Sequence, residues 1–193
     1  MTEQPKHPFQ TAPMTVDEYL VWGETHPGKY ELHDGVIVKM PSEQVGHVKV
    51  KYRVQTELLR AIKASGLGDL HTLADGVTVR IAPHRAYEPD ALVYAGAELP
   101  DTAIEIPNPV IVVEVLSPST ANFDATQKLI GYFGVPSIAH YLIVHPAELP
   151  VILHSRQADG TILTRLLQAG SVMLDPPGIE INISSLLPVA KSE

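Results

Sequence analysis

Short hydrophobic runs and longer amphipathic stretches alternate along this chain. Residues 110–116 are apolar at every position except one, and residues 140–144 form a second mainly apolar run. Such runs are typical of strands buried on both faces of a sheet. Asp-Gly pairs at residues 34–35, 75–76 and 159–160 lie between shorter runs, which predicts three β-hairpins. Further strand-like runs occupy residues 29–33, 36–40, 71–73, 77–81, 91–94, 151–154, 161–167 and 179–183.

Helical patterns are found in three segments. Aliphatic residues recur at every fourth position within residues 44–64, which predicts an amphipathic helix there. A Ser/Thr-x-x-Glu capping box at residues 15–18 predicts a short helix over about 16–25, because this box satisfies the free amides of a helix start. The polar break at residues 117–120 is expected to cap a third helix over about 121–133.

These elements predict a single α+β domain, with some α/β character, over residues 14–187. Its central mixed sheet is expected to be flanked by a few helices. Residues 1–13 contain three prolines and no periodicity, so a flexible leader is expected there, and residues 188–193 are expected to form a tail. A chain of 193 residues can bury one full core, and it shows no internal repeat or linker.

Charge and composition narrow the classes of function. The net charge of −8, from 14 basic and 22 acidic residues, argues against a large nucleic-acid footprint, because phosphate binding relies on clustered lysine and arginine. It does not exclude a nuclease, since carboxylates that bind a cation add negative charge. The absence of cysteine excludes disulfides and thiolate metal ligands. No apolar stretch approaches the roughly 20 residues of a membrane span, so a cytoplasmic protein without a membrane partner is expected.

An acidic pair is the strongest chemical signal. Glu114 is the one polar residue of the run 110–116, and burying a carboxylate costs several kcal/mol unless it is paired, protonated or bound to a cation. Asp90 follows Pro89 at the start of the preceding strand, so neighbouring strands place both acids at one sheet edge. Two close carboxylates repel, and a divalent cation removes that repulsion. Oxygen ligands without cysteine favour Mg²⁺ or Mn²⁺.

Lys128 is expected at the same level of the sheet. Glu114 lies roughly 10 Å before the strand end at ~3.3 Å per residue. Lys128 lies roughly 12 Å into the next helix at ~1.5 Å per residue. A helix that folds back along the strand therefore brings the ammonium beside the carboxylate, where it could orient an attacking water. Glu31, on the first hairpin, offers a further carboxylate, and Tyr132 lies one turn after Lys128.

Several motifs together resemble one protein family. They are Tyr30-Glu31-Leu32-His33-Asp34-Gly35, His47, Pro89-Asp90, the segment Val112 to Thr120, Lys128 with Tyr132, and Tyr141 to Val144. In combination they resemble the bacterial family of restriction-endonuclease-like proteins, a multi-paralogue group of the PD-(D/E)XK nuclease superfamily, over about residues 14–187.

The resemblance implies a restriction-endonuclease-like core and phosphodiester hydrolysis. It implies Asp90 and Glu114 as metal ligands, with the backbone carbonyl of Val115 as a further ligand. Glu31 would be a supporting acid and Lys128 the catalytic lysine. Nucleic acid, with DNA favoured over RNA, would be the substrate.

One position departs from the superfamily pattern. The lysine expected two residues after Glu114 is replaced by Leu116, and in the family the lysine is moved to the following helix, here to Lys128.

Structural alternatives exist for each candidate residue. Glu114 could form a buried structural ion pair with Lys128, and Asp90 could be a turn or strand-start residue after Pro89. Glu31 could face solvent, Lys128 could be a solvated helix lysine, and His47 could be a surface or core histidine. The nine histidines include no His-Glu-x-x-His motif, which argues against zinc hydrolysis.

An alternative function also stays open. The acidic charge balance favours a catalytically inactive nuclease-fold protein that serves as a binding or assembly module. A homodimer is a further expectation, because duplex cleavage often uses two copies of one site and symmetric dimers are common.

Overall fold

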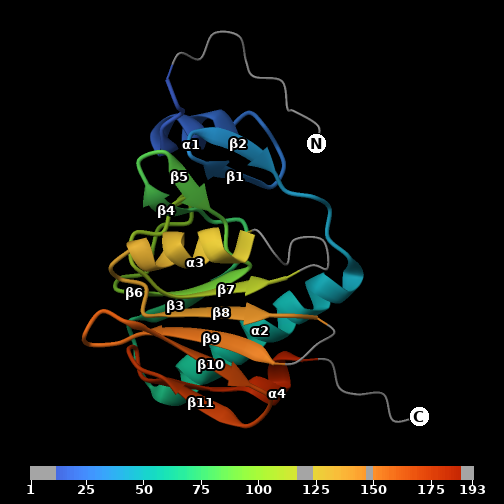
Figure 1. The fold of residues 1–193 in the computed structure, drawn as a ribbon, viewed down its shortest axis with the longest axis vertical. Coiled ribbons are helices and arrows are strands. Elements are labelled where there is room, and N and C mark those ends of the chain that lie inside the picture. Colours follow the sequence, from blue (N-terminus) through green and yellow to red (C-terminus); the bar gives the residue numbers. More distant parts are fainter. Residues whose placement is uncertain (1–11, 117–123, 147–149, 188–193) are drawn as a thin grey trace.

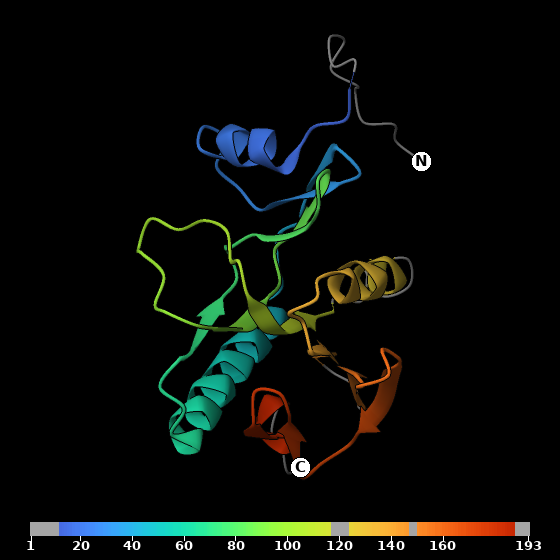
Figure 2. The same ribbon diagram turned by 90° about the vertical axis from the view of Figure 1, so that its left-hand side faces the viewer.

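The computed structural model describes residues 12–116, 124–146 and 150–187. Within these residues the chain forms a six-stranded mixed sheet, a four-stranded sheet and a two-stranded sheet. The helices α2 and α3 lie on opposite sides of the six-stranded sheet, as Figure 2 shows. The fold therefore has the predicted α+β class, with a central mixed sheet flanked by helices.

The elements follow one another along the chain as labelled in Figure 1. They are α1 (Val16–Gly23), β1 (Tyr30–His33), β2 (Val36–Lys39), α2 (Val45–Ser65), β3 (Leu70–Ala74), β4 (Val79–Ala82), β5 (Arg85–Tyr87), β6 (Ala91–Ala95), β7 (Pro109–Val115), α3 (Asp124–Gly134), β8 (His140–Val144), β9 (Val151–Arg156), β10 (Ile162–Leu167), β11 (Ser171–Leu174), β12 (Ile179–Asn182) and α4 (Ile183–Leu186).

The six-stranded sheet has the order β10-β9-β8-β7-β6-β3, and only β7 and β8 run parallel. Every residue of β7 is buried, as its apolar sequence predicts. Alternating side chains divide between two cores. Ile111 and Val113 join the core beneath α2, whereas Val112 joins the core beneath α3. By the same alternation Glu114 lies on the α3 side.

The four-stranded sheet has the order β2-β1-β5-β4 and packs against α1. The predicted hairpin of β1 and β2 is confirmed, with Asp34 and Gly35 at φ 51° and 81° in its turn. The predicted capping box is also present, since Thr15 and Glu18 bond each other's backbone amides. Leu32 of β1 packs toward α1, so its neighbour Glu31 points to the other face of this sheet, toward α3.

The hairpin predicted at Asp75-Gly76 is wrong. β3 pairs with β6 and β4 pairs with β5, so the flanking strands belong to different sheets. Burial overrides the local turn signal, because Leu70 packs in the core beneath α2 while Val79 packs with Tyr87 in the core beneath α3.

The C-terminal third follows the prediction in part. The β9–β10 hairpin across Asp159-Gly160 is confirmed, and the predicted last strand is β12. Its partner β11 and the helix α4 were not predicted. The cap expected at residues 117–120 lies outside the described residues, as do most of the expected leader and the whole expected tail. No helix among the described residues is long and apolar enough to cross a membrane.

Candidate active site

A buried lysine connects two buried carboxylates between the two larger sheets. Lys128 Nζ donates to Glu31 Oε1 at 2.8 Å and to Glu114 Oε1 at 3.0 Å. Tyr132, one turn further along α3, donates its hydroxyl to the same Glu114 oxygen at 2.6 Å. All four residues are at most 6% exposed. We refer to Glu31, Glu114, Lys128 and Tyr132 as the Lys128 network.

Close packing of α3 makes this network possible. Gly131 faces the ring of Tyr87, and a Cβ atom there would lie 2.7 Å from the Tyr87 ring. Without a side chain at this position, α3 approaches the four-stranded sheet closely, and Lys128 Nζ lies 5.6 Å from the centre of the same ring. The glycine thus allows a helix residue to reach both Glu31 of β1 and Glu114 of β7.

A second group of charges surrounds Asp90, immediately before β6. Lys29 and Lys51 each lie 3.1 Å from Asp90 Oδ1, and both lysines also contact Glu43 and Asp75. We refer to these five residues as the Asp90 network. Burial raises the pKa of Asp90, but the two ammonium groups and a backbone hydrogen bond outweigh burial and lower it. Asp90 is therefore held as a carboxylate.

The two networks meet at the end of β7. Asp90 Oδ2 accepts a 2.7 Å hydrogen bond from the amide of Val115, the residue after Glu114. On the same edge of β7, the carbonyl of Val115 contacts Nε2 of His47 from α2. The other ring nitrogen of His47 lies 3.3 Å from Glu43 Oε2. The antiparallel pairing of β6 with β7 thus places the predicted acids Asp90 and Glu114 at one edge of the sheet.

The two buried glutamates of the Lys128 network differ in their pKa. Burial raises the pKa of Glu114 to about 7, and Lys128 and Tyr132 only partly offset it. Burial also raises the pKa of Glu31, but hydrogen bonds from His33 and Lys128 outweigh it and lower the pKa. Lys128 is therefore shared between Glu31, which is held ionised, and Glu114, whose negative charge is only partly compensated by the groups around it.

The charge balance of the site fits a divalent cation. The Lys128 network has two carboxylates and one ammonium, and the Asp90 network has three carboxylates and two ammonium groups. Each network thus has one surplus negative charge when all groups are ionised. Carboxylate and carbonyl oxygens are the donors that Mg²⁺ and Mn²⁺ prefer. The residues present therefore suit such an ion.

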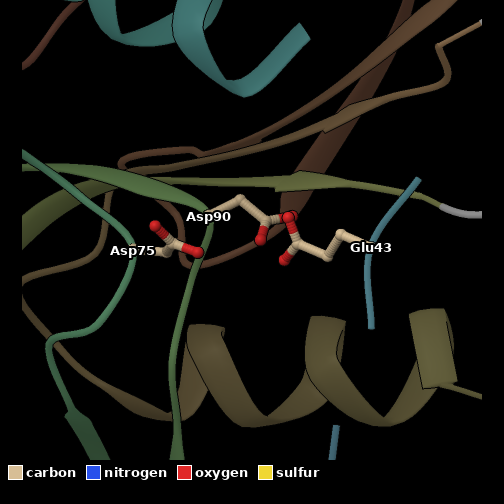
Figure 3. A group of neighbouring side chains, drawn as sticks. All are labelled: Glu43, Asp75 and Asp90. Atoms are coloured by element: carbon tan, nitrogen blue, oxygen red, sulfur yellow. The ribbon is translucent and has the colours of Figure 1, made fainter. Parts of the chain in front are cut away.

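Two sets of oxygen atoms could ligate that ion, and Asp90 belongs to both. The first is the set expected from the sequence: Asp90, Glu114 and the carbonyl of Val115. The second is Glu43, Asp75 and Asp90, which each offer one carboxylate oxygen within 4.8 Å of the others. Figure 3 shows the Asp90 carboxylate between those of Glu43 and Asp75.

The structure brings all the residues proposed from the sequence to one region. Glu31 is buried at 1% exposure rather than facing solvent, and Lys128 does lie level with Glu114.

Four members of the Asp90 network were missed: Lys29, Glu43, Lys51 and Asp75. A signal for Lys51 was available, because it falls on the buried helical stripe of Val54 and Leu58, where a lysine requires a partner. The Asp-Gly pattern assigns Asp75 to a hairpin turn, and nothing in the sequence marks Lys29 or Glu43.

Comparisons with known proteins find relatives over most of this chain. The family model described as "Putative restriction endonuclease" (Uma2) matches residues 16–190. Two uncharacterised proteins of Synechocystis sp. (strain PCC 6803) are each 28% identical to the chain. One aligns over 170 residues, which cover 88% of this chain and 87% of the relative. The other aligns over 136 residues, which cover 68% of this chain and 74% of the relative.

A solved structure has a similar fold. The crystal structure of a putative nuclease from Anabaena variabilis superposes with a TM-score of 0.68 at 18% sequence identity. The match covers 90% of this chain and 97% of that chain. The likeness confirms the predicted fold, a restriction-endonuclease-like core.

Proposed function

Because this chain belongs to the family described as "Putative restriction endonuclease", we propose that it is a metal-dependent endonuclease that hydrolyses phosphodiester bonds of nucleic acid, with DNA as the expected substrate. One observation carries the proposal: Lys128 is buried between Glu31 and Glu114, beside a second acid, Asp90. A purely structural core gains little from such a group, since replacing a buried ion pair by apolar residues is often neutral or stabilising.

Asp90, Glu114 and the carbonyl of Val115 are the proposed ligands of a Mg²⁺ or Mn²⁺ ion. When bound, such an ion polarises a phosphate oxygen and lowers the pKa of a bound water. The chain's own side chains are proposed to position the reacting groups and to exclude other water molecules from the site. Lys128 is proposed to orient the attacking water and to offset the charge that develops on the phosphate. Glu31, which binds Lys128 at 2.8 Å, is proposed to fix the direction of the lysine side chain.

A cleavage assay tests this proposal directly. Plasmid DNA, single-stranded DNA and RNA are incubated with the protein in Mg²⁺, in Mn²⁺ and in EDTA. We expect cleavage that requires metal and that falls at least a hundredfold in Glu114→Gln and in Asp90→Asn. Glu98→Gln, which changes an exposed glutamate, is the matched control and should cleave normally. Cleavage that survives in both site variants would contradict the assignment of the acids.

A second candidate function rests on the contacts of Asp90. Both of its oxygens are already engaged, Oδ1 by Lys29 and Lys51 and Oδ2 by the Val115 amide. Ammonium groups can replace a metal as partners of a carboxylate. The chain could therefore be an inactive nuclease-fold protein that serves as a binding or assembly module. Absence of cleavage on all three substrates, together with no effect of millimolar metal on the melting temperature, would favour this function.

A further inference from the structure

Positive charge is concentrated on one helix of this acidic protein. The 21 residues of α2 include five of the chain's 14 basic residues but only one of its 22 acidic residues. The basic residues are Lys49, Lys51, Arg53, Arg60 and Lys63. The helix therefore has a surplus of four positive charges, and the net charge of −8 does not exclude a local surface that binds phosphates.

Two of these five basic side chains are already paired. Lys51 belongs to the Asp90 network, and Arg60 binds Glu57 and the carbonyl of Glu180.

The other three basic side chains, Lys49, Arg53 and Lys63, have no hydrogen bond or ion pair with any residue that the structure describes. Lys49 and Lys63 are exposed and Arg53 is half-buried. Their charges are therefore available to a ligand.

These three residues share the outer face of α2 with an aromatic ring. Tyr52 lies between Lys49 and Arg53 in the sequence and is 74% exposed. The opposite face of the helix packs into the core through Val50 and other buried aliphatic residues. We refer to Lys49, Tyr52, Arg53 and Lys63 as the outer face of α2. An exposed tyrosine among unpaired cations is a combination suited to nucleic acid, because cations attract phosphates and bases stack on aromatic rings.

The same helix reaches the candidate active site from its inner face. His47 contacts Val115 and Lys51 contacts Asp90, and Figure 1 shows α2 starting beside the end of β7. An α-helix is roughly 10 Å across, and duplex phosphates of one strand are spaced about 3.4 Å along the axis. The outer face of α2 is therefore about one helix diameter, or roughly three phosphate spacings, from the side chains of the same helix that contact Val115 and Asp90.

We propose that the outer face of α2 binds the sugar–phosphate backbone of the nucleic-acid substrate. This inference rests on the proposed function and assigns it a substrate-binding surface. Lys49, Arg53 and Lys63 each contact a phosphate, and Tyr52 stacks on a base where the strand is unpaired. From Lys49 to Lys63 the helix rises about 21 Å at 1.5 Å per residue, which is long enough to contact several successive phosphates.

A second copy of this chain is a weaker candidate for the same surface. Val45, Val48 and Leu59 are exposed beside it and could support a dimer through α2. A twofold contact would, however, bring the unpaired cations of one helix close to those of the other, and like charges repel. A nucleic acid is a polyanion that attracts these cations, so the charge pattern favours nucleic acid over a second copy of the chain.

Binding measured without metal tests the inference separately from cleavage. Fluorescence anisotropy in EDTA follows the wild type with labelled duplex DNA, single-stranded DNA and RNA over a range of salt concentrations. Lys49→Gln, Arg53→Gln and Lys63→Gln are each expected to reduce the slope of log K against log salt by about 0.9 on duplex DNA. Lys39→Gln removes one charge from an exposed lysine of β2 and should leave the slope unchanged.

The three kinds of nucleic acid distinguish the roles within the surface. Tyr52→Ser is expected to weaken binding of single-stranded DNA and RNA about tenfold, since unpaired bases stack on aromatic side chains, and to affect the duplex less. Circular dichroism verifies that each variant keeps its helix content.

The outcomes separate this inference from the proposed function. Weak binding by the triple variant of Lys49, Arg53 and Lys63, with normal binding by the control, supports the inference. Equal binding by the triple variant and wild type, or no salt-dependent binding by wild type, overturns it even where metal-dependent cleavage is observed. A wild-type dimer in sedimentation that dissociates in Leu59→Gln, with unchanged nucleic-acid binding, would identify this face as a subunit interface instead and also overturn it.

Discussion

Tyr132 and Glu114 form a hydrogen bond of 2.6 Å in the buried centre of the molecule, where neither residue is more than 6% exposed. The same Glu114 oxygen accepts from Lys128 at 3.0 Å. Two donors on one carboxylate oxygen fix the direction of a side chain that the strand alone leaves free to rotate. The orientation of the candidate catalytic acid thus depends on a tyrosine that need not touch substrate.

Tyr132→Phe is expected to keep the fold and lower activity. A buried hydrogen bond to a charged group contributes about 1.5–3 kcal/mol, so the free energy of unfolding should fall by roughly this amount above pH 7, where Glu114 is ionised. Cleavage should fall about tenfold, because Glu114 is less well oriented. Urea unfolding and single-turnover cleavage measure the two effects. Tyr94→Phe is the matched control, since this tyrosine is also buried and its hydroxyl accepts from the Leu99 amide. Equal losses in both variants would contradict a specific role.

Lys128→Met is expected to destabilise the metal-free protein by about 3–5 kcal/mol, because removing one partner of a buried ion pair leaves an uncompensated charge. Adding Glu114→Gln to this variant removes one of the two stranded carboxylates and should restore part of the loss. Urea unfolding in EDTA measures both variants, with Lys39→Met as an exposed control. Strictly additive losses would show that the two side chains are not coupled.

The sequence predicted the Lys128–Glu114 contact because two simple periods determine it. A strand and a helix each rise by a fixed length per residue. The distances from Glu114 to the end of its strand, and from the start of the next helix to Lys128, therefore follow from the numbers of residues between them. Burial of Glu114 was predictable in the same way, since it interrupts a continuous apolar run. These local rules do not need the rest of the fold.

The Asp90 network was not predictable from such rules. Its members come from four separate segments that only the packing of α2 and of the two sheets brings together. Asp75 shows most clearly where local sequence rules fail. The Asp-Gly pair predicts a tight hairpin, whereas β3 and β4 belong to different sheets because their apolar residues are buried in different cores. The ligand roles proposed for Asp90, Glu114 and Val115 stay predictions.

Metal binding should distinguish the two sets of candidate ligands. At 100 times its dissociation constant a ligand stabilises the folded state by about 2.7 kcal/mol, so Mg²⁺ or Mn²⁺ should raise the melting temperature of the wild type. We expect this increase to vanish in Asp90→Asn and Glu114→Gln and to persist in Asp75→Asn. Loss of the increase in Asp75→Asn but not in Glu114→Gln would instead assign the ion to Glu43, Asp75 and Asp90.

Gly131→Ala is expected to separate α3 from the four-stranded sheet. The new Cβ would lie 2.7 Å from the ring of Tyr87, which is itself buried at 1% exposure, so the ring or the helix must shift. Overpacking of this kind costs about 1–3 kcal/mol, although alanine is the better helix former. The shift moves Lys128 away from Glu31, so cleavage should fall together with stability.

A second glycine of the same helix provides the control for this effect. Gly134 is exposed, and a Cβ there would meet nothing within 4 Å. Gly134→Ala should therefore leave cleavage unchanged and leave the free energy of unfolding equal or slightly higher. If Gly131→Ala proves as harmless as Gly134→Ala, close packing against Tyr87 is not needed for the Lys128 network.

His140 should make the stability of the fold depend on pH at a point remote from the candidate site. This histidine starts β8, is 3% exposed and contacts the hydroxyl of Ser155 at 2.9 Å. Burial lowers its pKa to about 4, below the ~6.5 of an unfolded histidine. The unfolded chain therefore takes up a proton first as the pH falls. The stability from neutral His140 is complete above pH ~6.5 and is lost between about 6.5 and 4, by on the order of 3 kcal/mol in total.

Urea unfolding across this pH range checks the prediction by comparing wild type with His140→Gln. Glutamine retains a hydrogen-bonding side chain but does not titrate, so the variant should lose less stability than wild type between pH 6.5 and 4. The difference between the two curves isolates the histidine from the carboxylates, which also titrate at the acidic end. Parallel curves for wild type and His140→Gln would mean that the histidine is charged in the folded protein, despite its burial.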